Sequence, residues 1–146
     1  MEIAAVTKFI SEAIDDGRAT SEIGIFVRSH DQLSRARAAV KRARIEVFEL
    51  SGAHEDQGSH VGVGTMHMAK GLEFKAVAVM ACDDDVLPLQ SRIESVADEV
   101  ELDDVYETER HLLYVACTRA RDRLMISGVS PGSEFLADLE QPGHPW

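Results

Sequence analysis

The sequence predicts an α/β fold in which a mostly parallel sheet is flanked by helices. Segments with helical spacing of apolar residues alternate along the chain with short apolar runs, as parallel strands joined by crossover helices require. The runs 23–27 and 76–81 are apolar nearly throughout, which is typical of strands buried on both faces of a sheet. With 146 residues, 45% of them hydrophobic, the chain suits a single domain, 1–146.

The first half of the chain yields two helices and two strands. Residues 3–14 carry apolar side chains at helical spacing, and Gly17 follows as a stop signal. Residues 23–27 form a buried strand, and a second amphipathic helix follows it up to about residue 42. Residues 45–50 alternate apolar and polar, which indicates a half-buried strand.

The second half of the chain also combines predicted strands with predicted helices. After a polar loop at 51–59, short apolar runs at 61–64 and 76–81 predict two more buried strands. Residues 107–120 predict a helix, and residues 123–127 predict the last strand. A short helix capped at its N-terminus by Ser133 follows, and the tail 141–146 is expected to be loose.

The net charge of -11 comes from one acidic segment. Between Asp83 and Glu109 there are 11 acidic residues and a single basic one, Arg92. We expect a surface loop over about 83–108, because this segment is acidic and its Ile, Val and Leu residues are scattered. The run 35–44 is basic and contains no acid, so it forms either a solvated helix face or a nucleic-acid contact.

Cys82 and Cys117 lie far apart and form no CxxC pattern, so the sequence predicts neither a disulfide framework nor a metal site. Buried free thiols are typical of a reducing compartment, and the expected localisation is cytoplasmic. The sequence contains no apolar run as long as a membrane span, and its first residues do not resemble a signal peptide.

A polar loop between two predicted buried strands is the first candidate for chemistry, because ligands gather at the carboxyl ends of strands in such sheets. Residues 64–71 read G-T-M-H-M-A-K-G, a near match to the phosphate loop of nucleotide-binding proteins. Ala69 replaces the second glycine of that motif, and Gly71 replaces its hydroxyl residue. One hypothesis is therefore a self-contained NTPase, with acidic residues 83–85 as its magnesium ligands.

Two stretches resemble motifs of UvrD/Rep-like superfamily 1 DNA helicases. The first reads Thr65-x-His67-x-Ala69-Lys70-Gly71-Leu72-Glu73-Phe74 and is similar to motif V. The second, residues 109–121, reads E-R-H-L-L-Y-V-A-C-T-R-A-R and is similar to motif VI. The resemblance implies the second, C-terminal RecA-like domain of such a helicase, with its three-layer α/β fold. Only 36 residues separate Arg28 from Thr65, so the extra domain that larger members insert there is missing.

The resemblance implies roles on the nucleotide side. ATP with Mg²⁺ would be bound mainly by a first RecA-like domain, which carries the phosphate loop and the magnesium acid. Arg119 would enter from this domain as an arginine finger, and Glu73 would contact the ribose. Gly71 would let the backbone approach the phosphates, and Lys70 would touch phosphate or pair with an acid. The isolated chain is then predicted to be inactive.

The resemblance also implies a DNA side. Thr65 and His67 would face single-stranded DNA. Arg28 and His30 would be further contacts to the DNA backbone. The expected partners are therefore single-stranded DNA and the N-terminal RecA-like domain of the same protein. The alternative hypothesis is a non-catalytic module, in which a helicase-like domain binds DNA or a protein through its acidic segment.

Overall fold

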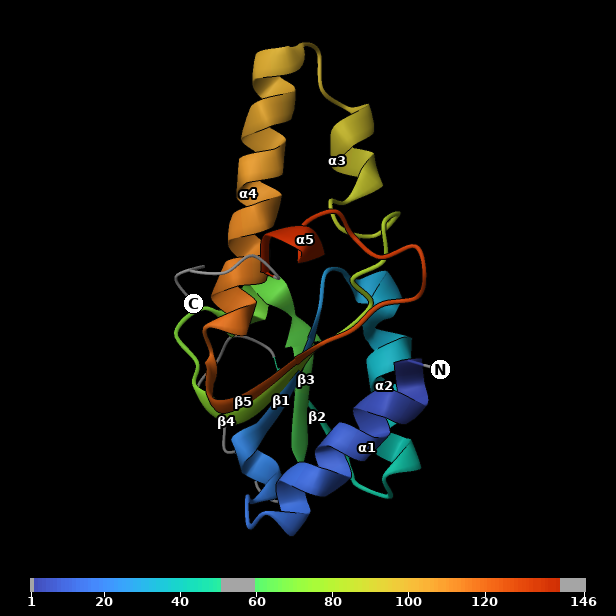
Figure 1. Cartoon of the computed structure of the whole chain (residues 1–146), viewed down its shortest axis with the longest axis vertical. Coiled ribbons are helices and arrows are strands. Elements are labelled where there is room, and N and C mark those ends of the chain that lie inside the picture. The colour runs from blue at the N-terminus through green and yellow to red at the C-terminus, as the bar shows by residue number, and fades with distance from the viewer. Residues whose placement is uncertain (1, 51–59, 140–146) are drawn as a thin grey trace.

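The computed structural model describes residues 2–50 and 60–139, and a five-stranded sheet forms its centre (Figure 1). All strand pairs are parallel, in the order β2-β3-β1-β4-β5. The elements are α1 (Glu2–Asp15), β1 (Ile23–Val27), α2 (Leu33–Arg42), β2 (Val47–Glu49), β3 (Val61–Thr65), β4 (Phe74–Val79), α3 (Gln90–Glu94), α4 (Glu99–Cys117), β5 (Ala120–Ile126) and α5 (Leu136–Leu139). The predicted α/β class and the parallel sheet are confirmed.

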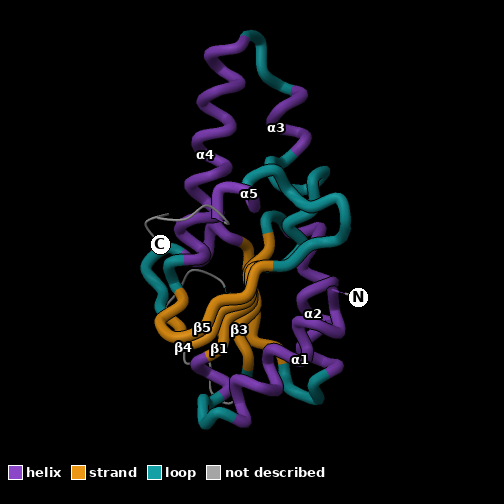
Figure 2. The backbone as a smooth tube through the Cα atoms, in the orientation of Figure 1, coloured by secondary structure: helices purple, strands orange, loops and turns teal. Residues whose placement is uncertain are grey.

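The two faces of the sheet carry separate hydrophobic cores. Side chains alternate along β1, so Ile25 points to one face and Phe26 to the other. Helices α1 and α2 pack on the face of Ile25, while α4 covers the face of Phe26. Figure 2 shows this three-layer arrangement, with α1 and α2 together on one side of the strands. The crossovers therefore bury both faces, as the continuous apolar runs predict.

Several element boundaries differ from the prediction by a few residues. The last strand, β5, begins at Ala120, three residues before the predicted start. The strand predicted at 76–81 is β4, Phe74–Val79. The predicted loop 51–59 and the tail 141–146 lie outside the described residues. Boundaries shift in this way because pairing with a neighbouring strand, rather than local composition, decides where a strand begins.

The prediction of a loop over 83–108 is wrong for much of that segment. Residues 90–94 form α3, and α4 starts at Glu99 instead of near residue 107. Asp98 caps α4 by accepting a hydrogen bond from the Glu101 N–H at 2.8 Å, and the Glu101 carboxylate accepts one from the Ala97 N–H at 2.8 Å. Acidic residues in a first helical turn are also favoured by the helix dipole.

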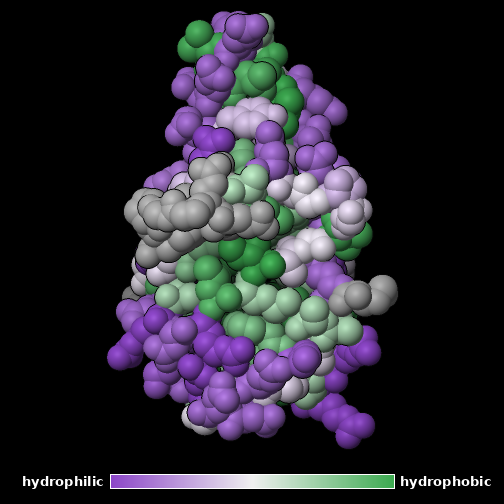
Figure 3. Space-filling view, viewed as in Figure 1, coloured by the Kyte–Doolittle hydropathy of each residue, from purple (hydrophilic) through white to green (hydrophobic). Residues whose placement is uncertain are grey.

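Helices α3 and α4 form an arm that projects beyond the sheet (Figures 1 and 2). The surface of this arm is mostly hydrophilic, while hydrophobic side chains on the same side of the molecule gather nearer the sheet (Figure 3). Val100, near the start of α4, is 72% exposed. Most acidic residues of the segment 83–109 therefore lie exposed on this arm.

Candidate nucleotide and DNA sites

The motif-V-like loop, residues 65–74, runs from the carboxyl end of β3 to the amino end of β4. Thr65 ends β3 opposite Val27 of β1, and a 3-10 turn, Met66–Ala69, follows. Met66 and Ala69 are buried in the core beneath α4. The loop then reaches Gly71, whose φ of 81° favours glycine, and enters β4.

This path excludes the self-contained phosphate loop. A phosphate loop leads from a strand into the N-terminus of a helix, whose free N–H groups bind the phosphates. Here β3 leads through a four-residue 3-10 turn into β4. The side chain of Asp83 is bound to Arg35 and to the Val129 N–H. Residues 64–71 therefore do not have the strand-to-helix geometry of a phosphate loop.

The four candidate DNA residues come from the carboxyl ends of two neighbouring strands. Arg28 and His30 follow β1, while Thr65 ends β3 and His67 lies in the turn after it. Both histidines are exposed, and Thr65 is 6% exposed. The carboxyl ends of adjacent parallel strands meet at one edge, so the structure brings these candidates together.

Arg28 differs from the other three because its guanidinium is turned into the protein. Its Nε and Nη2 donate to the two carboxylate oxygens of Glu109 at 2.7 and 2.6 Å. Arg28 is 4% exposed and Glu109 is 0% exposed. Glu109 also accepts hydrogen bonds from the Leu89 N–H and from Arg92 Nη1. A contact between Arg28 and DNA therefore stays a prediction, while the ion pair is a feature of the fold.

The charges of the Arg28–Glu109 pair affect the pKa values of Glu109 and His67. Burial alone would raise the pKa of Glu109, but the hydrogen bonds from Arg28 and the Leu89 N–H outweigh it and lower the pKa. Partial desolvation of the exposed His67 lowers its pKa, and the positive charges of Arg28 and Arg92 lower it further against the opposing charge of Glu109. The lowered pKa favours the neutral imidazole, which can both donate and accept hydrogen bonds.

The candidate nucleotide residues lie at the opposite end of the strands. The Phe74 N–H donates to the Arg119 carbonyl at 2.9 Å, which places Glu73 beside Arg119 at the amino ends of β4 and β5. Lys70, Gly71 and Glu73 are exposed. Ligands were expected at carboxyl ends of strands, so this half of the loop differs from the expectation. The difference arises because the loop crosses the sheet before β4 begins.

The Arg119 side chain lies against the motif-V-like loop. Its Nη1 donates to the Leu72 carbonyl at 3.3 Å, and its Nη2 contacts the Thr118 hydroxyl at the same distance. Its Nε is buried and has no hydrogen-bond partner within the described part of the chain. Buried donors are usually paired, so an unpaired donor on a candidate arginine finger is compatible with a site that is incomplete.

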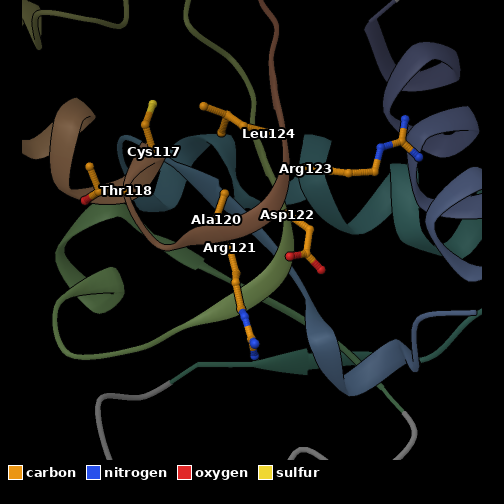
Figure 4. A pocket seen from close by; sticks show the side chains of 7 residues that line it. All are labelled: Cys117, Thr118, Ala120, Arg121, Asp122, Arg123 and Leu124. Carbon is orange, nitrogen blue, oxygen red and sulfur yellow. The ribbon is translucent and has the colours of Figure 1, made fainter. Parts of the chain in front are cut away.

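Two shallow hollows flank these residues. One, of about 180 Å³, is lined by Ser21, Glu22, Glu73, Phe74, Lys75 and Arg121. The other, of about 270 Å³, is lined by Cys117, Thr118, Ala120, Arg121, Asp122, Arg123 and Leu124 (Figure 4). Figure 4 shows Arg121 and Arg123 leaving β5 in different directions, with Arg123 directed toward α1. Glu73 lines the first hollow, and Thr118 and Ala120, the neighbours of Arg119, line the second.

Glu109 is the residue of this region that sequence reasoning missed. Its signal is the spacing Val105, Glu109, Leu113 and Ala116, which places the carboxylate on the buried face of α4. A charged residue at a core position needs a buried partner. The sequence could therefore have indicated that an arginine or lysine must reach Glu109, although not which one.

The class of this domain follows from comparison with a protein family. The sequence profile of the family described as "UvrD-like helicase C-terminal domain" matches residues 45–130. This match covers more than half of the chain, including both motifs and the ion-paired Glu109. The chain belongs to the UvrD-like helicase C-terminal domain family.

Individual relatives agree with the family. The chain is 41% identical over 96 residues to the ATP-dependent DNA helicase UvrD1 of Mycobacterium leprae, which covers 58% of this chain and 11% of that helicase. It is 32% identical over 107 residues to the ATP-dependent DNA helicase PcrA of Bacillus subtilis, which covers 64% of this chain and 14% of that helicase. The chain thus spans about a tenth of the length of these relatives.

A solved structure supports the fold. The C-terminal domain of a possible DNA helicase from Lactobacillus plantarum WCFS1 superposes with a TM-score of 0.61 and 24% sequence identity. The superposition covers 93% of this chain and 71% of that one. At this identity the likeness establishes the fold alone.

The described residues contain neither a candidate membrane span nor a candidate metal cluster. None of the helices in residues 2–50 and 60–139 has the length and apolar character needed to cross a membrane. Within the same ranges no group of three or more His, Cys, Asp or Glu side chains could hold a metal ion.

Proposed function

We propose that this chain is the C-terminal RecA-like domain of an ATP-dependent DNA helicase and supplies Arg119 to ATP held by a first RecA-like domain. The observation that carries the proposal is the hydrogen bond between the Phe74 N–H and the Arg119 carbonyl, which keeps the Glu73 and Arg119 backbones together at one open edge. Exposed Lys70 and Gly71 complete that edge. Such a half-site lacks a phosphate cradle and needs a facing surface.

The chemistry of this half-site is charge stabilisation. Phosphoryl transfer spreads negative charge over the γ-phosphate oxygens, and a guanidinium entering from a facing domain stabilises that charge. A planar guanidinium can hold two phosphate oxygens at once, which an ammonium group cannot do. Glu73 would accept hydrogen bonds from ribose hydroxyls, and Gly71 would admit phosphate close to the backbone. Lys70 would add a positive charge, and the first domain would supply the Mg²⁺ ligands.

The opposite edge would bind single-stranded DNA. Thr65, His67 and His30 can bond phosphate oxygens through hydroxyl and imidazole groups. Nucleotide and DNA would thus meet opposite ends of the same loop, 65–74. ATP-dependent closure of the two RecA-like domains would move this loop relative to the strand of DNA and step the motor along it.

Steady-state ATP hydrolysis tests the proposal on two proteins, the isolated chain and the whole helicase in which it is joined to the phosphate-loop domain. The whole helicase is expected to hydrolyse ATP, faster with single-stranded DNA, while the isolated chain shows no turnover above background. Sustained turnover by the isolated chain, or none by the whole helicase, would refute the proposal. The second outcome would favour the non-catalytic module.

A pH series tests His67. The pKa of His67 is lowered from 6.5, so the imidazole is neutral at pH 7 and gains its proton only in more acidic solution. A bound phosphate favours the imidazolium, so DNA binding takes up a proton and tightens as the pH falls toward the lowered pKa of His67. We expect fluorescence anisotropy to show this tightening for the isolated chain and a flatter profile for His67→Gln. Equal pH profiles for the two proteins would show that His67 does not meet phosphate.

A further inference from the structure

The Arg28–Glu109 ion pair is the most buried charged group in the described part of the chain, and neither comparison nor motif gives it a role. Its side chains are 5% and 0% exposed. Both carboxylate oxygens of Glu109 are occupied: one binds Arg28 Nε and the Leu89 N–H, the other Arg28 Nη2 and Arg92 Nη1. A phosphate would have to break this arrangement to reach the guanidinium.

The Arg28–Glu109 ion pair attaches the middle of α4 to the sheet. Arg119, two residues after the end of α4, provides a second attachment. Glu109 joins the middle of α4 to the carboxyl end of β1 and to the segment after β4. Ten residues later Arg119 contacts the motif-V-like loop through the Leu72 carbonyl. From Glu109 to Cys117, the last residue of α4, the helix rises about 12 Å, so the two attachments lie near opposite ends of the sheet.

The same ion pair also lies beside the DNA edge, by which we mean the candidate DNA residues His30, Thr65 and His67 at the carboxyl ends of β1 and β3. Arg28 and Glu109 are close enough to His67 for their charges to act on its pKa. The turn that carries His67 packs beneath α4 through Met66 and Ala69. The DNA edge and the arginine finger are therefore both attached to α4, the helix that Glu109 ties to the carboxyl end of β1.

We propose that Arg28 and Glu109 are positioning residues, whose buried ion pair holds α4 so that Arg119 meets the nucleotide, and that Arg28 does not itself contact DNA. This inference rests on the proposed function. It assigns Arg28 to the interior and leaves phosphate contact to Thr65, His67 and His30. A bidentate pair suits this task, because it fixes both distance and orientation.

The test uses the whole helicase and the double variant Arg28→Gln/Glu109→Gln, which removes both charges and leaves no buried ion of this pair without its partner. We expect kcat for DNA-stimulated ATP hydrolysis to fall about tenfold to a hundredfold, as displaced catalytic groups do, while KM for single-stranded DNA stays unchanged. The slope of log affinity against log salt for single-stranded DNA should also stay unchanged. Glu49→Gln is the matched control, because Glu49 pairs with Arg37 at the surface, and it should leave kcat at the wild-type value.

Two results would overturn this inference. A salt slope smaller by about 0.7 in the double variant would mean that Arg28 neutralises a phosphate. An unchanged kcat would mean that the ion pair does not position Arg119. If the double variant fails to fold, Arg28→Lys takes its place, and a wild-type kcat in that variant overturns the proposal. Absence of ATP hydrolysis by the wild-type helicase would instead refute the proposed function.

Discussion

Replacing Arg119 with Ala is expected to lower kcat for ATP hydrolysis by the whole helicase by about 10³-fold or more, the usual effect of removing an arginine finger. The reason is that its guanidinium would act on the γ-phosphate, where charge develops in the transition state. ADP has no γ-phosphate, so its dissociation constant should change little. Steady-state kinetics and equilibrium titration with ADP measure the two effects on the same protein.

Arg121 provides the matched control for that experiment. It lies two residues after Arg119, is exposed, and lines both hollows beside the nucleotide edge. Arg121→Ala should retain most of the wild-type kcat. If Arg121→Ala abolishes turnover and Arg119→Ala does not, the finger has been assigned to the wrong arginine. Circular dichroism of both variants verifies that the fold is intact.

The largest effect on stability is expected for Glu109→Leu. This change leaves the Arg28 guanidinium buried without its carboxylate, and breaking one partner of a buried ion pair destabilises a protein by about 3–5 kcal/mol. Urea unfolding of the isolated chain measures the loss. Adding Arg28→Met should recover much of it, because an apolar pair of similar volume often replaces a buried ion pair without loss.

Surface and pH controls sharpen this prediction. Glu49→Leu removes an exposed partner and should change the unfolding free energy by about 1 kcal/mol or less. The folded-state pKa of Glu109 is lowered from 4.5, so its stabilising contribution is complete above that pH and is lost as the pH falls through the folded-state pKa. The Glu109→Leu chain should therefore lose less stability on acidification. A destabilisation equal to that of Glu49→Leu would contradict the burial of the pair.

Much of the fold could be predicted because its strands are buried on both faces. The runs that became β1 and β4 contain few polar residues, so their burial is visible locally. The start of α4 was also predictable, because Asp98 followed by Glu101 is a capping-box pattern. Composition is the wrong guide there: high charge predicts a loop, whereas acidic residues stabilise the N-terminus of a helix.

Other parts of the site depend on tertiary contacts that no local pattern encodes. Arg28 and Glu109 are 81 residues apart, and the sequence does not show that they pair. Similarly, residues 65–74 form one continuous motif, yet its first residues lie at the carboxyl end of β3 and its last at the amino end of β4. Periodicity locates strands, but only the crossover reveals which edge each side chain reaches.

The central claim is that Arg119 acts on a nucleotide held by another domain, and nucleotide-dependent association tests it most directly. The chain and the separate phosphate-loop domain are mixed, and their affinity is measured with no nucleotide and with ADP–aluminium fluoride, which mimics the transition state. The account predicts association at least about tenfold tighter with the analogue, since such analogues gain affinity from transition-state contacts, and no such gain for the Arg119→Ala chain. Equal affinity under both conditions, or the same gain without Arg119, would contradict it.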